Sequence, residues 1–249
     1  MENYQKKLAG KTTLVTGAGR GIGKAIAVSY AKAGAVVSCA SRTYAEIEET
    51  VREIEAAGRQ GLAIQADVTE LPAVRNMFRT AADAFGGLDI VVIAAGDYFE
   101  DKTVEESDPE LWHASISVNL MGAYYCAKTA VPYLRERGGG KIIMIGSGLG
   151  HRGRPRTSAY ACAKAGLWTL TRVLAQEVLQ YNISVNELIP GPVRTNLTAD
   201  VLAQSGGTPR IAGEWAKTPE DVVPLALFLA EQPLVGPTAQ SFSLMRRDS

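Results

Sequence analysis

Residues 12–27 read TTLVTGAGRGIGKAIA, and this stretch decides the fold. It begins with a short apolar run rich in β-branched residues, typical of a buried strand, and ends with a composition that favours a helix. Between the two stand glycines at positions 17, 19, 21 and 23. Glycines at a strand-to-helix turn let the backbone approach a pyrophosphate at the helix N-terminus. The stretch predicts a phosphate-binding turn, although the strict pattern G-x-G-x-x-G is absent; the alternative is a tight turn that binds no ligand.

Similar apolar runs recur along the chain, with helix-length segments between them. They lie at residues 12–16, 35–40, 61–66, 88–95, 141–146, 183–189 and 239–244. This alternation predicts a parallel sheet with crossover helices, and the continuous apolar runs indicate strands that are buried on both faces. We therefore expect an α/β fold, a Rossmann-type doubly wound parallel β-sheet flanked by helices on both faces.

No repeat or linker divides the sequence, so we expect a single domain over residues 1–249. The segment at 190–217 interrupts the regular alternation, because it is rich in Pro, Gly and Thr and only weakly periodic. It follows the sixth predicted strand, where a connection borders the binding crevice of such a sheet. We expect a substrate lid there.

Composition and charge exclude several classes of protein. Lys plus Arg and Asp plus Glu both number 26, so no net charge attracts nucleic acid or an anionic membrane. No apolar run approaches the roughly 20 residues that span a bilayer, and residues 1–10 lack the apolar core of a signal peptide. Cys39, Cys126 and Cys162 lack metal-ligand spacing, and we expect reduced packing residues. We expect a cytoplasmic protein with no metal site.

Two nearly identical hexapeptides carry a tyrosine followed four residues later by a lysine. They are AYYCAK with Tyr124 and Lys128, and AYACAK with Tyr160 and Lys164. On a helix both pairs share a face. A tyrosine can protonate a developing alkoxide, and a nearby ammonium favours the phenolate and lowers the tyrosine pKa. The spacing alone does not choose between the pairs, but Tyr160 follows Ser147 by thirteen residues, and Ser147 ends a predicted strand.

The order of these motifs resembles the classical short-chain dehydrogenase/reductase family. The glycine turn fits that family's T-G-x-x-x-G-x-G pattern at Thr16, Gly17, Gly21 and Gly23, and IGSGLG followed by YACAK is similar to its catalytic core. The resemblance covers about residues 8–245. It implies an oxidoreductase that interconverts a carbonyl and a secondary alcohol by hydride transfer, with a catalytic tetrad of Asn119, Ser147, Tyr160 and Lys164.

The same resemblance implies a role for each member of this tetrad. Tyr160 would be the general acid in reduction and the base in oxidation, and Ser147 would bind the substrate oxygen. Lys164 would bind the nicotinamide ribose and lower the pKa of Tyr160. Asn119, expected on the preceding long helix, would hold a water that links Lys164 to solvent. Tyr124 would then serve packing or subunit contact.

The resemblance also implies the contacts of a dinucleotide cofactor. At the end of the second strand NAD-binding proteins usually carry Asp or Glu, whereas here Ser41 and Arg42 stand there and no acid precedes Glu46. Arg42 and Arg20 can pair with a 2′-phosphate, so we expect NADP(H) in preference to NAD(H). Asp67 either contacts adenine or caps the next helix, or does both. The expected contacts are Gly17, Gly19, Arg20, Gly21, Ile22, Gly23, Ser41, Arg42, Asp67, Val68, Ala94, Gly96, Tyr160, Lys164, Val193 and Thr195.

Two segments depart from the family pattern. The family's N-N-A-G is here Ile93-Ala94-Ala95-Gly96, which removes two side-chain amides and leads us to expect weaker local stability. The C-terminus reads SFSLMRRDS in place of a V-D-G-G-like tail, so its subunit contacts are expected to be atypical. The resemblance implies a homo-oligomer, either a tetramer or a dimer.

The substrate expected from these residues is a small carbonyl compound or alcohol. Arg152, Arg154 and Arg156 border the expected pocket, where they either bind an anionic group or form a solvated basic loop. A 3-oxoacyl-[acyl-carrier-protein] reductase is one alternative, but positions where such enzymes carry arginines here hold Gly138 and Tyr181. An NADPH-sensing regulator without turnover is another, and it is disfavoured because all four tetrad positions are filled.

Overall fold

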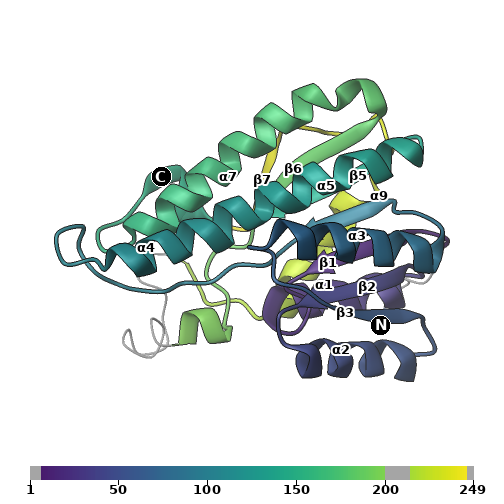
Figure 1. Cartoon of the computed structure of the whole chain (residues 1–249), viewed down its shortest axis with the longest axis horizontal. Helices are drawn as coiled ribbons and strands as arrows, with labels where there is room; N and C mark the ends of the chain where they lie inside the picture. The colour runs from purple at the N-terminus through teal and green to yellow at the C-terminus, as the bar shows by residue number, and fades with distance from the viewer. Residues whose placement is uncertain (1–6, 200–213, 246–249) are drawn as a thin grey trace.

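The computed structural model describes residues 7–199 and 214–245. Within them, seven parallel strands form one sheet in the order β3-β2-β1-β4-β5-β6-β7 (Figure 1). Each of the seven predicted apolar runs overlaps a strand, and the predicted α/β fold is confirmed. The strands are β1 (Thr12–Thr16), β2 (Val36–Ser41), β3 (Gly61–Gln65), β4 (Ile90–Ile93), β5 (Gly140–Ile145), β6 (Ile183–Ile189) and β7 (Ser241–Ser243).

Helices cover both faces of this sheet. On one face lie α1 (Gly21–Lys32), α2 (Tyr44–Ala56) and α9 (Val223–Glu231), and on the other lie α3 (Leu71–Phe85), α5 (Gly122–Glu136) and α7 (Ser158–Glu177) (Figure 1). Shorter helical segments complete the described chain. They are α4 (Pro109–Ile116), η1 (Ser117–Met121), α6 (Gly148–Arg152), η2 (Leu179–Tyr181), η3 (Asn196–Thr198) and η4 (Pro219–Val222).

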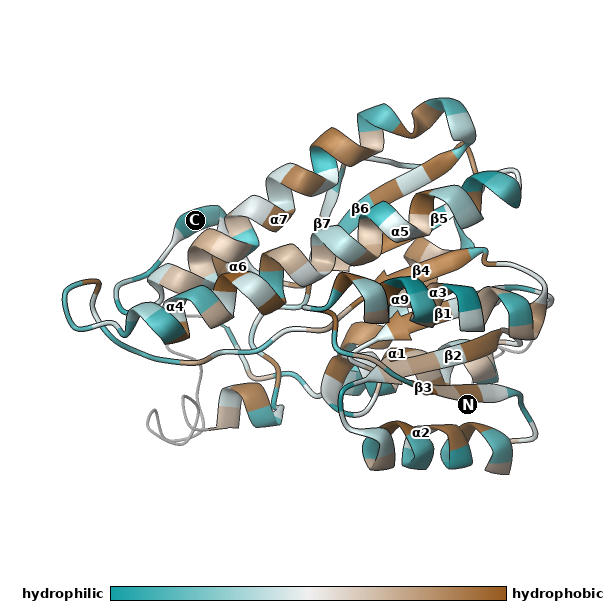
Figure 2. Ribbon diagram, in the orientation of Figure 1, coloured by the Kyte–Doolittle hydropathy of each residue, from teal (hydrophilic) through white to brown (hydrophobic). Residues whose placement is uncertain are grey.

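The two cores follow directly from the alternation of side chains along each strand. On β1, Leu14 belongs to the core under α3, α5 and α7, whereas Val15 belongs to the core under α1, α2 and α9. Val91 and Val92 of β4 divide in the same way. Both faces of a central strand are therefore apolar, which explains the continuous hydrophobic runs. In Figure 2 the strands are mostly brown, and α2 turns its brown side to the sheet and its teal side away.

The strand order reverses at β1, and this reversal positions the functional cleft. β1 pairs with β2 on one side and with β4 on the other, so that Val15 lies opposite both Cys39 and Val92. The connections after β1 and β4 leave the same edge of the sheet in opposite directions. In open α/β sheets the crevice at such a switch point is where ligands bind.

The predicted lid at 190–217 lies partly outside the described residues; the described part contains a β-bridge between Val193 and Lys217.

Cys39 and Cys126 are buried, and burial raises the pKa of each thiol to about 12. Cys162 is exposed on α7, so the prediction of a packing residue is wrong for this cysteine.

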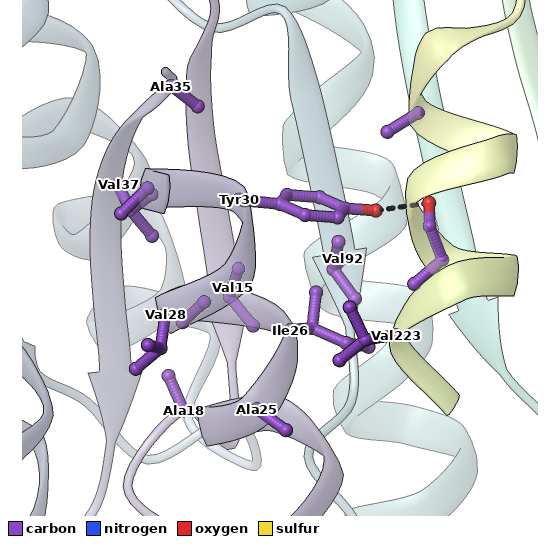
Figure 3. Close-up of a cluster of buried hydrophobic side chains, with 14 of the residues drawn as sticks. Val15, Ala18, Ala25, Ile26, Val28, Tyr30, Ala35, Val37, Val92 and Val223 are labelled. Carbon is purple, nitrogen blue, oxygen red and sulfur yellow. Dashed lines mark hydrogen bonds between the residues drawn. The ribbon is translucent and has the colours of Figure 1, made fainter. Parts of the chain in front are cut away.

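Tyr30 fixes α1 against α9. Its side chain is fully buried among apolar residues of the first core, and its hydroxyl donates a 2.7 Å hydrogen bond to the backbone oxygen of Ala226 (Figure 3). Burial raises the pKa of this phenol far above its ordinary value. The tyrosine is therefore neutral, and it satisfies its one polar group by bridging two helices.

We predict that Tyr30→Phe lowers the free energy of unfolding by about 1 kcal/mol, since it removes one buried hydrogen bond and leaves the packing unchanged. Urea unfolding of the two proteins measures this difference. Tyr44→Phe is the control, because Tyr44 is half exposed at the start of α2. Equal stability of wild type and Tyr30→Phe would show that the Ala226 bond contributes nothing.

Candidate active site

The turn after β1 is built to hold an anion close to the backbone. Gly17 has φ +67°, and a β carbon there would lie 2.9 Å from the backbone nitrogen of Ala95. A β carbon at Gly23 would overlap the carbonyl oxygen of Gly17. Helix α1 begins directly afterwards with Arg20 as its N-cap, and no side chain caps it. Its first N–H groups therefore remain available for a phosphate.

A cleft extends from this turn across the carboxyl ends of the strands. It brings together every residue expected to contact the cofactor, and it also contains Ser147 of the tetrad. Asn119 is buried beside the cleft and does not line it. Sequence analysis did not assign several other lining residues, among them Thr43, Glu46, Asp97, Val118, Pro190, Gly191 and Asn196.

Ser147, Tyr160 and Lys164 meet on one wall of this cleft. Ser147 follows β5 and is the N-cap of α6, where its hydroxyl accepts a 3.2 Å hydrogen bond from the N–H of Leu149. Tyr160 and Lys164 lie one turn apart on α7. The Lys164 ammonium donates to the backbone oxygen of Ile145 at 2.8 Å and lies 5.6 Å from the centre of the Tyr160 ring.

The second tyrosine and lysine pair lies elsewhere. Tyr124 and Lys128 are exposed on α5, and neither lines the cleft. The hexapeptides are nearly identical, yet only the second one has its lysine bound to the end of β5, at the backbone oxygen of Ile145. The chemical difference between the two pairs therefore comes from their surroundings.

Burial controls the titration of the catalytic candidates. It raises the pKa of Tyr160 to about 12, an effect that the neighbouring Tyr98 increases and a hydrogen bond with Ser147 opposes. Burial also lowers the pKa of Lys164 to about 8, and the charge of Glu187 opposes this shift. The net shift of the Tyr160 pKa is upward because desolvation of the phenolate is its largest cause. That Lys164 lowers this pKa stays a prediction.

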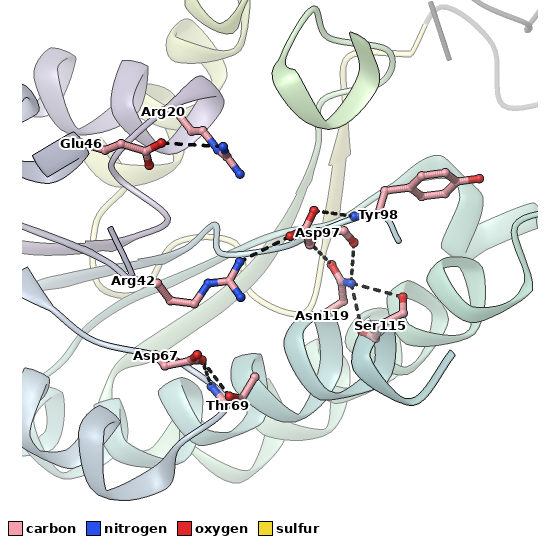
Figure 4. Close-up of polar contacts among 9 residues, drawn as sticks. All are labelled: Arg20, Arg42, Glu46, Asp67, Thr69, Asp97, Tyr98, Ser115 and Asn119. Atoms are coloured by element: carbon pink, nitrogen blue, oxygen red, sulfur yellow. Dashed lines mark hydrogen bonds and ion pairs between the residues drawn. The ribbon is translucent and has the colours of Figure 1, made fainter. Parts of the chain in front are cut away.

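Backbone hydrogen bonds hold Asn119 beside the cleft. It lies in η1, a π-helical turn that joins α4 to α5 without a break, so the long helix expected to carry it runs from Pro109 to Glu136. Its amide nitrogen donates to the backbone oxygens of Asp97 at 2.8 Å and Ser115 at 3.0 Å, and its oxygen accepts from the N–H of Asp97 at 3.2 Å (Figure 4). A β carbon on Gly96 would lie within 4 Å of both Asn119 and Lys164. The two side chains therefore converge at Gly96.

Both arginines expected near the cofactor form ion pairs. Arg20 lies 3.7 Å from Glu46, and Arg42 lies 3.4 Å from Asp97 (Figure 4). Each arginine side chain is more than half exposed, so these pairs contribute little to stability. Sequence analysis missed both acids as site residues. Asp97 could have been found, because it directly follows Gly96 at the end of the β4 segment.

Local hydrogen bonds explain two further features of the cleft. Asp67 accepts from the N–H and hydroxyl of Thr69, so it closes the turn before α3 (Figure 4). It does not cap α3, whose N-cap is Glu70. Thr16 accepts hydrogen bonds from the N–H groups of Ala94 at 3.1 Å and Ala95 at 3.2 Å. The N–H groups of Ala94 and Ala95 are therefore hydrogen-bonded even though the two side-chain amides of the family pattern are missing. The expected loss of local stability would not come from an unpaired donor at these two residues.

The basic loop before α7 contains contacts that the sequence left open. Arg156 has φ +71° and binds both the carboxylate and the backbone oxygen of Asp101. It therefore ties this loop to the segment after β4. His151 contacts Glu187, a buried residue of β6 that sequence analysis did not single out.

The cleft combines a phenol that can donate a proton, an ammonium and a hydroxyl with a turn that fits the phosphates of a dinucleotide. This combination indicates an oxidoreductase. A family model described as short chain dehydrogenase matches residues 11–206. A short-chain dehydrogenase/reductase of Armillaria gallica is 39% identical over 240 residues, covering 90% of each chain. The NADPH-dependent aldehyde reductase-like protein, chloroplastic, of Arabidopsis thaliana is 34% identical, covering 90% of this chain and 88% of its own. This chain belongs to the short-chain dehydrogenase/reductase family.

Solved structures agree with this assignment. A short-chain type dehydrogenase/reductase from Mycobacterium marinum superposes with a TM-score of 0.89 at 31% identity, covering 96% of this chain and 95% of its own. Among the helices of the described residues, none is long and apolar enough to cross a membrane.

We predict that Lys164→Met raises the free energy of unfolding at pH 7 by about 1–3 kcal/mol. At pH 7 the folded and the unfolded wild type both carry the proton, and the folded state bears the cost of the buried ammonium. Between about pH 8 and its ordinary pKa of 10.5, the folded protein loses this proton first. Stability of the wild type then rises with pH relative to the variant, and the difference shrinks.

Urea unfolding of both proteins at pH 7 and pH 10.5 measures this effect. Lys128→Met is the matched control, because Lys128 occupies the same hexapeptide position on an exposed helix face. A difference between Lys164→Met and wild type that stays constant over this pH range would contradict the buried-ammonium interpretation.

Proposed function

We propose that this protein is an NADP(H)-dependent oxidoreductase that interconverts a carbonyl and a secondary alcohol by hydride transfer, with Tyr160 as general acid and base. One observation carries the proposal: Ser147, Tyr160 and Lys164 share a wall of the cleft that begins at the glycine turn. A substrate carbonyl next to this wall would be within reach of a hydroxyl, a phenol and a cofactor at the same time.

The residues of the cleft fit a nicotinamide dinucleotide. The close approach at Gly17 and Gly23 and the uncapped start of α1 suit a pyrophosphate. Val68 of the β3–α3 loop would contact the adenine, and Val193 and Thr195 would lie at the nicotinamide end. A bound nicotinamide would supply the hydride for reduction and accept it in oxidation.

The chain's own groups would manage the proton. The neutral Tyr160 hydroxyl donates its proton to the substrate oxygen during reduction, while Ser147 donates a hydrogen bond to the same oxygen. Burial holds the phenol in the protonated form at neutral pH, which suits this direction. In oxidation the phenolate is required. Lys164 then stabilises it as an ammonium, and it would also bind the ribose of the cofactor.

The preference for NADP(H) rests on Arg20 and Arg42. Both line the cleft where β2 ends, and Ser41 occupies the position at which an NAD-binding protein usually carries an acid. A 2′-phosphate would replace Glu46 and Asp97 as the partner of these guanidinium groups. The Arabidopsis relative is named for its dependence on NADPH. Glu46 is the residue that would instead favour NAD(H), because it could accept from a ribose hydroxyl.

The proposal also covers the location, the domain organisation, the substrate and the oligomeric state of the protein. We place the protein in the cytoplasm, as a single domain, with a small carbonyl or alcohol substrate and a lid over residues 190–217. We also propose a homo-oligomer, either a tetramer or a dimer. Arg156 is turned to Asp101, so it serves the architecture of the loop and not an anionic substrate.

We predict that Tyr160→Phe lowers kcat at least about 100-fold and leaves NADPH binding intact, because it removes only the proton donor. Tyr124→Phe should retain turnover within about twofold, since its hydroxyl lies outside the cleft. NADPH and NADH oxidation by purified protein is measured across ketones, keto-sugars, aldehydes and 3-oxoacyl thioesters.

Each result of this panel has a clear meaning. Equal losses in the two tyrosine variants would contradict the assignment of Tyr160. Turnover restricted to 3-oxoacyl thioesters would identify a 3-oxoacyl-[acyl-carrier-protein] reductase. Tight NADPH binding without turnover on any compound would instead favour a nucleotide-sensing regulator.

We predict that Arg42→Ala raises the dissociation constant of NADPH about 10- to 100-fold and changes that of NADH by less than about threefold, because only NADPH carries the 2′-phosphate. Fluorescence titration of both cofactors measures the two constants. Arg52→Ala is the matched control, since Arg52 pairs with Glu48 on the exposed side of α2. A parallel loss for NADH and NADPH would refute the assigned role of Arg42.

A further inference from the structure

Glu187 is a charged residue in a fully buried strand. It lies on β6 between Asn186 and Leu188, and its side chain has no exposure to solvent. Burying a carboxylate is costly unless other groups compensate for the lost hydration. An apolar side chain would satisfy the packing of β6. The presence of a carboxylate therefore calls for a function near this position.

One oxygen of this carboxylate joins three elements of the fold. Oε2 accepts a 2.9 Å hydrogen bond from Nε2 of His151 on α6 and a 2.6 Å hydrogen bond from the hydroxyl of Ser241 on β7. Because an ionised carboxylate only accepts, Nε2 carries the hydrogen. The His151 ring also packs against Trp168 of α7, with 4.9 Å between ring centres. Glu187 therefore links α6 to strands β6 and β7.

The second oxygen points at the backbone that leads into Ser147. A β carbon on Gly146 would overlap Oε1, so glycine is required there. Among the residues that the structure describes, Oε1 has no hydrogen-bond partner. The cation on this side of the site is Lys164, whose ammonium binds the oxygen of Ile145, one residue before Gly146. The charge of Glu187 raises the pKa of Lys164 and so opposes the effect of burial.

Helix α6 transmits this anchoring to the reacting groups. Ser147 is its N-cap, and His151 lies at its other end. The helix also packs closely on α7, since a β carbon on Gly150 would lie 2.6 Å from the backbone of Lys164. A shift of α6 would therefore change the direction of the Ser147 hydroxyl. It would also change the packing of α6 against α7.

We propose that Glu187 is a positioning residue of the active centre, which holds α6 and Ser147 in place through His151 and keeps Lys164 in its ammonium form through its buried charge. This inference rests on the proposed oxidoreductase function. The polar and charged groups that act on the carboxylate come from three elements. They are His151 from α6, Lys164 from α7 and Ser241 from β7, while β5 contributes the uncharged Gly146.

Arg172 does not take the place of Lys164 as the partner of this charge. Its guanidinium lies 5.0 Å from the centre of the Trp168 ring and donates to the backbone oxygen of Ala239. Lys164 is therefore the ammonium that the carboxylate influences most directly in the reaction centre.

Glu187→Gln tests the charge, because glutamine keeps the size and an acceptor oxygen. The readout is the pH dependence of kcat/KM for NADPH, which reports groups of the enzyme without cofactor. We expect the decline above about pH 8 to move to lower pH by about one unit, which corresponds to a tenfold lower rate on the alkaline side. Ser241→Ala removes a hydrogen bond to the same oxygen but no charge, so its profile should keep the position of wild type. Identical profiles for wild type and Glu187→Gln would overturn the inference.

A measurement without turnover separates this inference from the proposed function. A double-mutant cycle combines Glu187→Gln with Lys164→Met in urea unfolding at pH 7. We expect a coupling on the order of tenfold in the unfolding equilibrium constant, because the two charges attract in a buried setting. Coupling without any turnover of carbonyl substrates would mean that the electrostatic link is correct and the proposed oxidoreductase function fails. Absence of coupling would overturn the inference whatever the activity.

His151 supplies a second test that applies even if Glu187→Gln does not fold. His151→Leu removes the donor to Glu187 and leaves the carboxylate in place, and we expect kcat to fall about tenfold with an unchanged dissociation constant for NADPH. His151→Gln restores an N–H donor and should recover most of kcat. A merely structural contact would not give this selective loss and recovery, so equal kcat in both variants and wild type would overturn the positioning role.

Discussion

The hydroxyl of Thr16 makes the pair of hydrogen bonds on which the rest of the structure depends. It accepts from the N–H groups of Ala94 and Ala95, and so it joins the end of β1 to the end of β4. At this point the strand order reverses and the chain leaves the sheet in two opposite directions. The cleft opens there, with the glycine turn on one side. The small side chains at 94 and 95 let the backbone of Gly17 lie close by, which larger residues would obstruct.

Burial then determines the chemistry of this cleft. Removal of water makes every charged form more costly, so the pKa of Tyr160 rises and that of Lys164 falls. The phenol is consequently a proton donor at neutral pH, and the ammonium is close to losing its proton. A buried carboxylate at Glu187 opposes the second of these shifts. The electrostatics of the site thus depend on a balance between desolvation and one nearby charge, and this balance can be changed by single substitutions.

The two ends of the cleft differ in how their charges are held. At the β2 end, Arg20 and Arg42 are exposed and paired with carboxylates, so an incoming anion can replace these partners at small cost. At the catalytic end, Asn119, Lys164 and Glu187 are buried and fixed by backbone and side-chain hydrogen bonds. An adaptable charged end suits the binding of different nucleotides. A rigid end suits the orientation of reacting groups.

The sequence by itself determined the seven strands, the glycine turn and the order of Ser147, Tyr160 and Lys164, because apolar runs and turn residues are local signals. The hexapeptides around Tyr124 and Tyr160 did not by themselves distinguish the two tyrosines, whereas the tertiary structure places Tyr160 in the cleft and Tyr124 outside its lining. It also decided the direction of each pKa shift, the ion pairs of the two arginines and the contact between His151 and Glu187. These properties depend on desolvation and on distances between residues far apart in the chain, which no local pattern records.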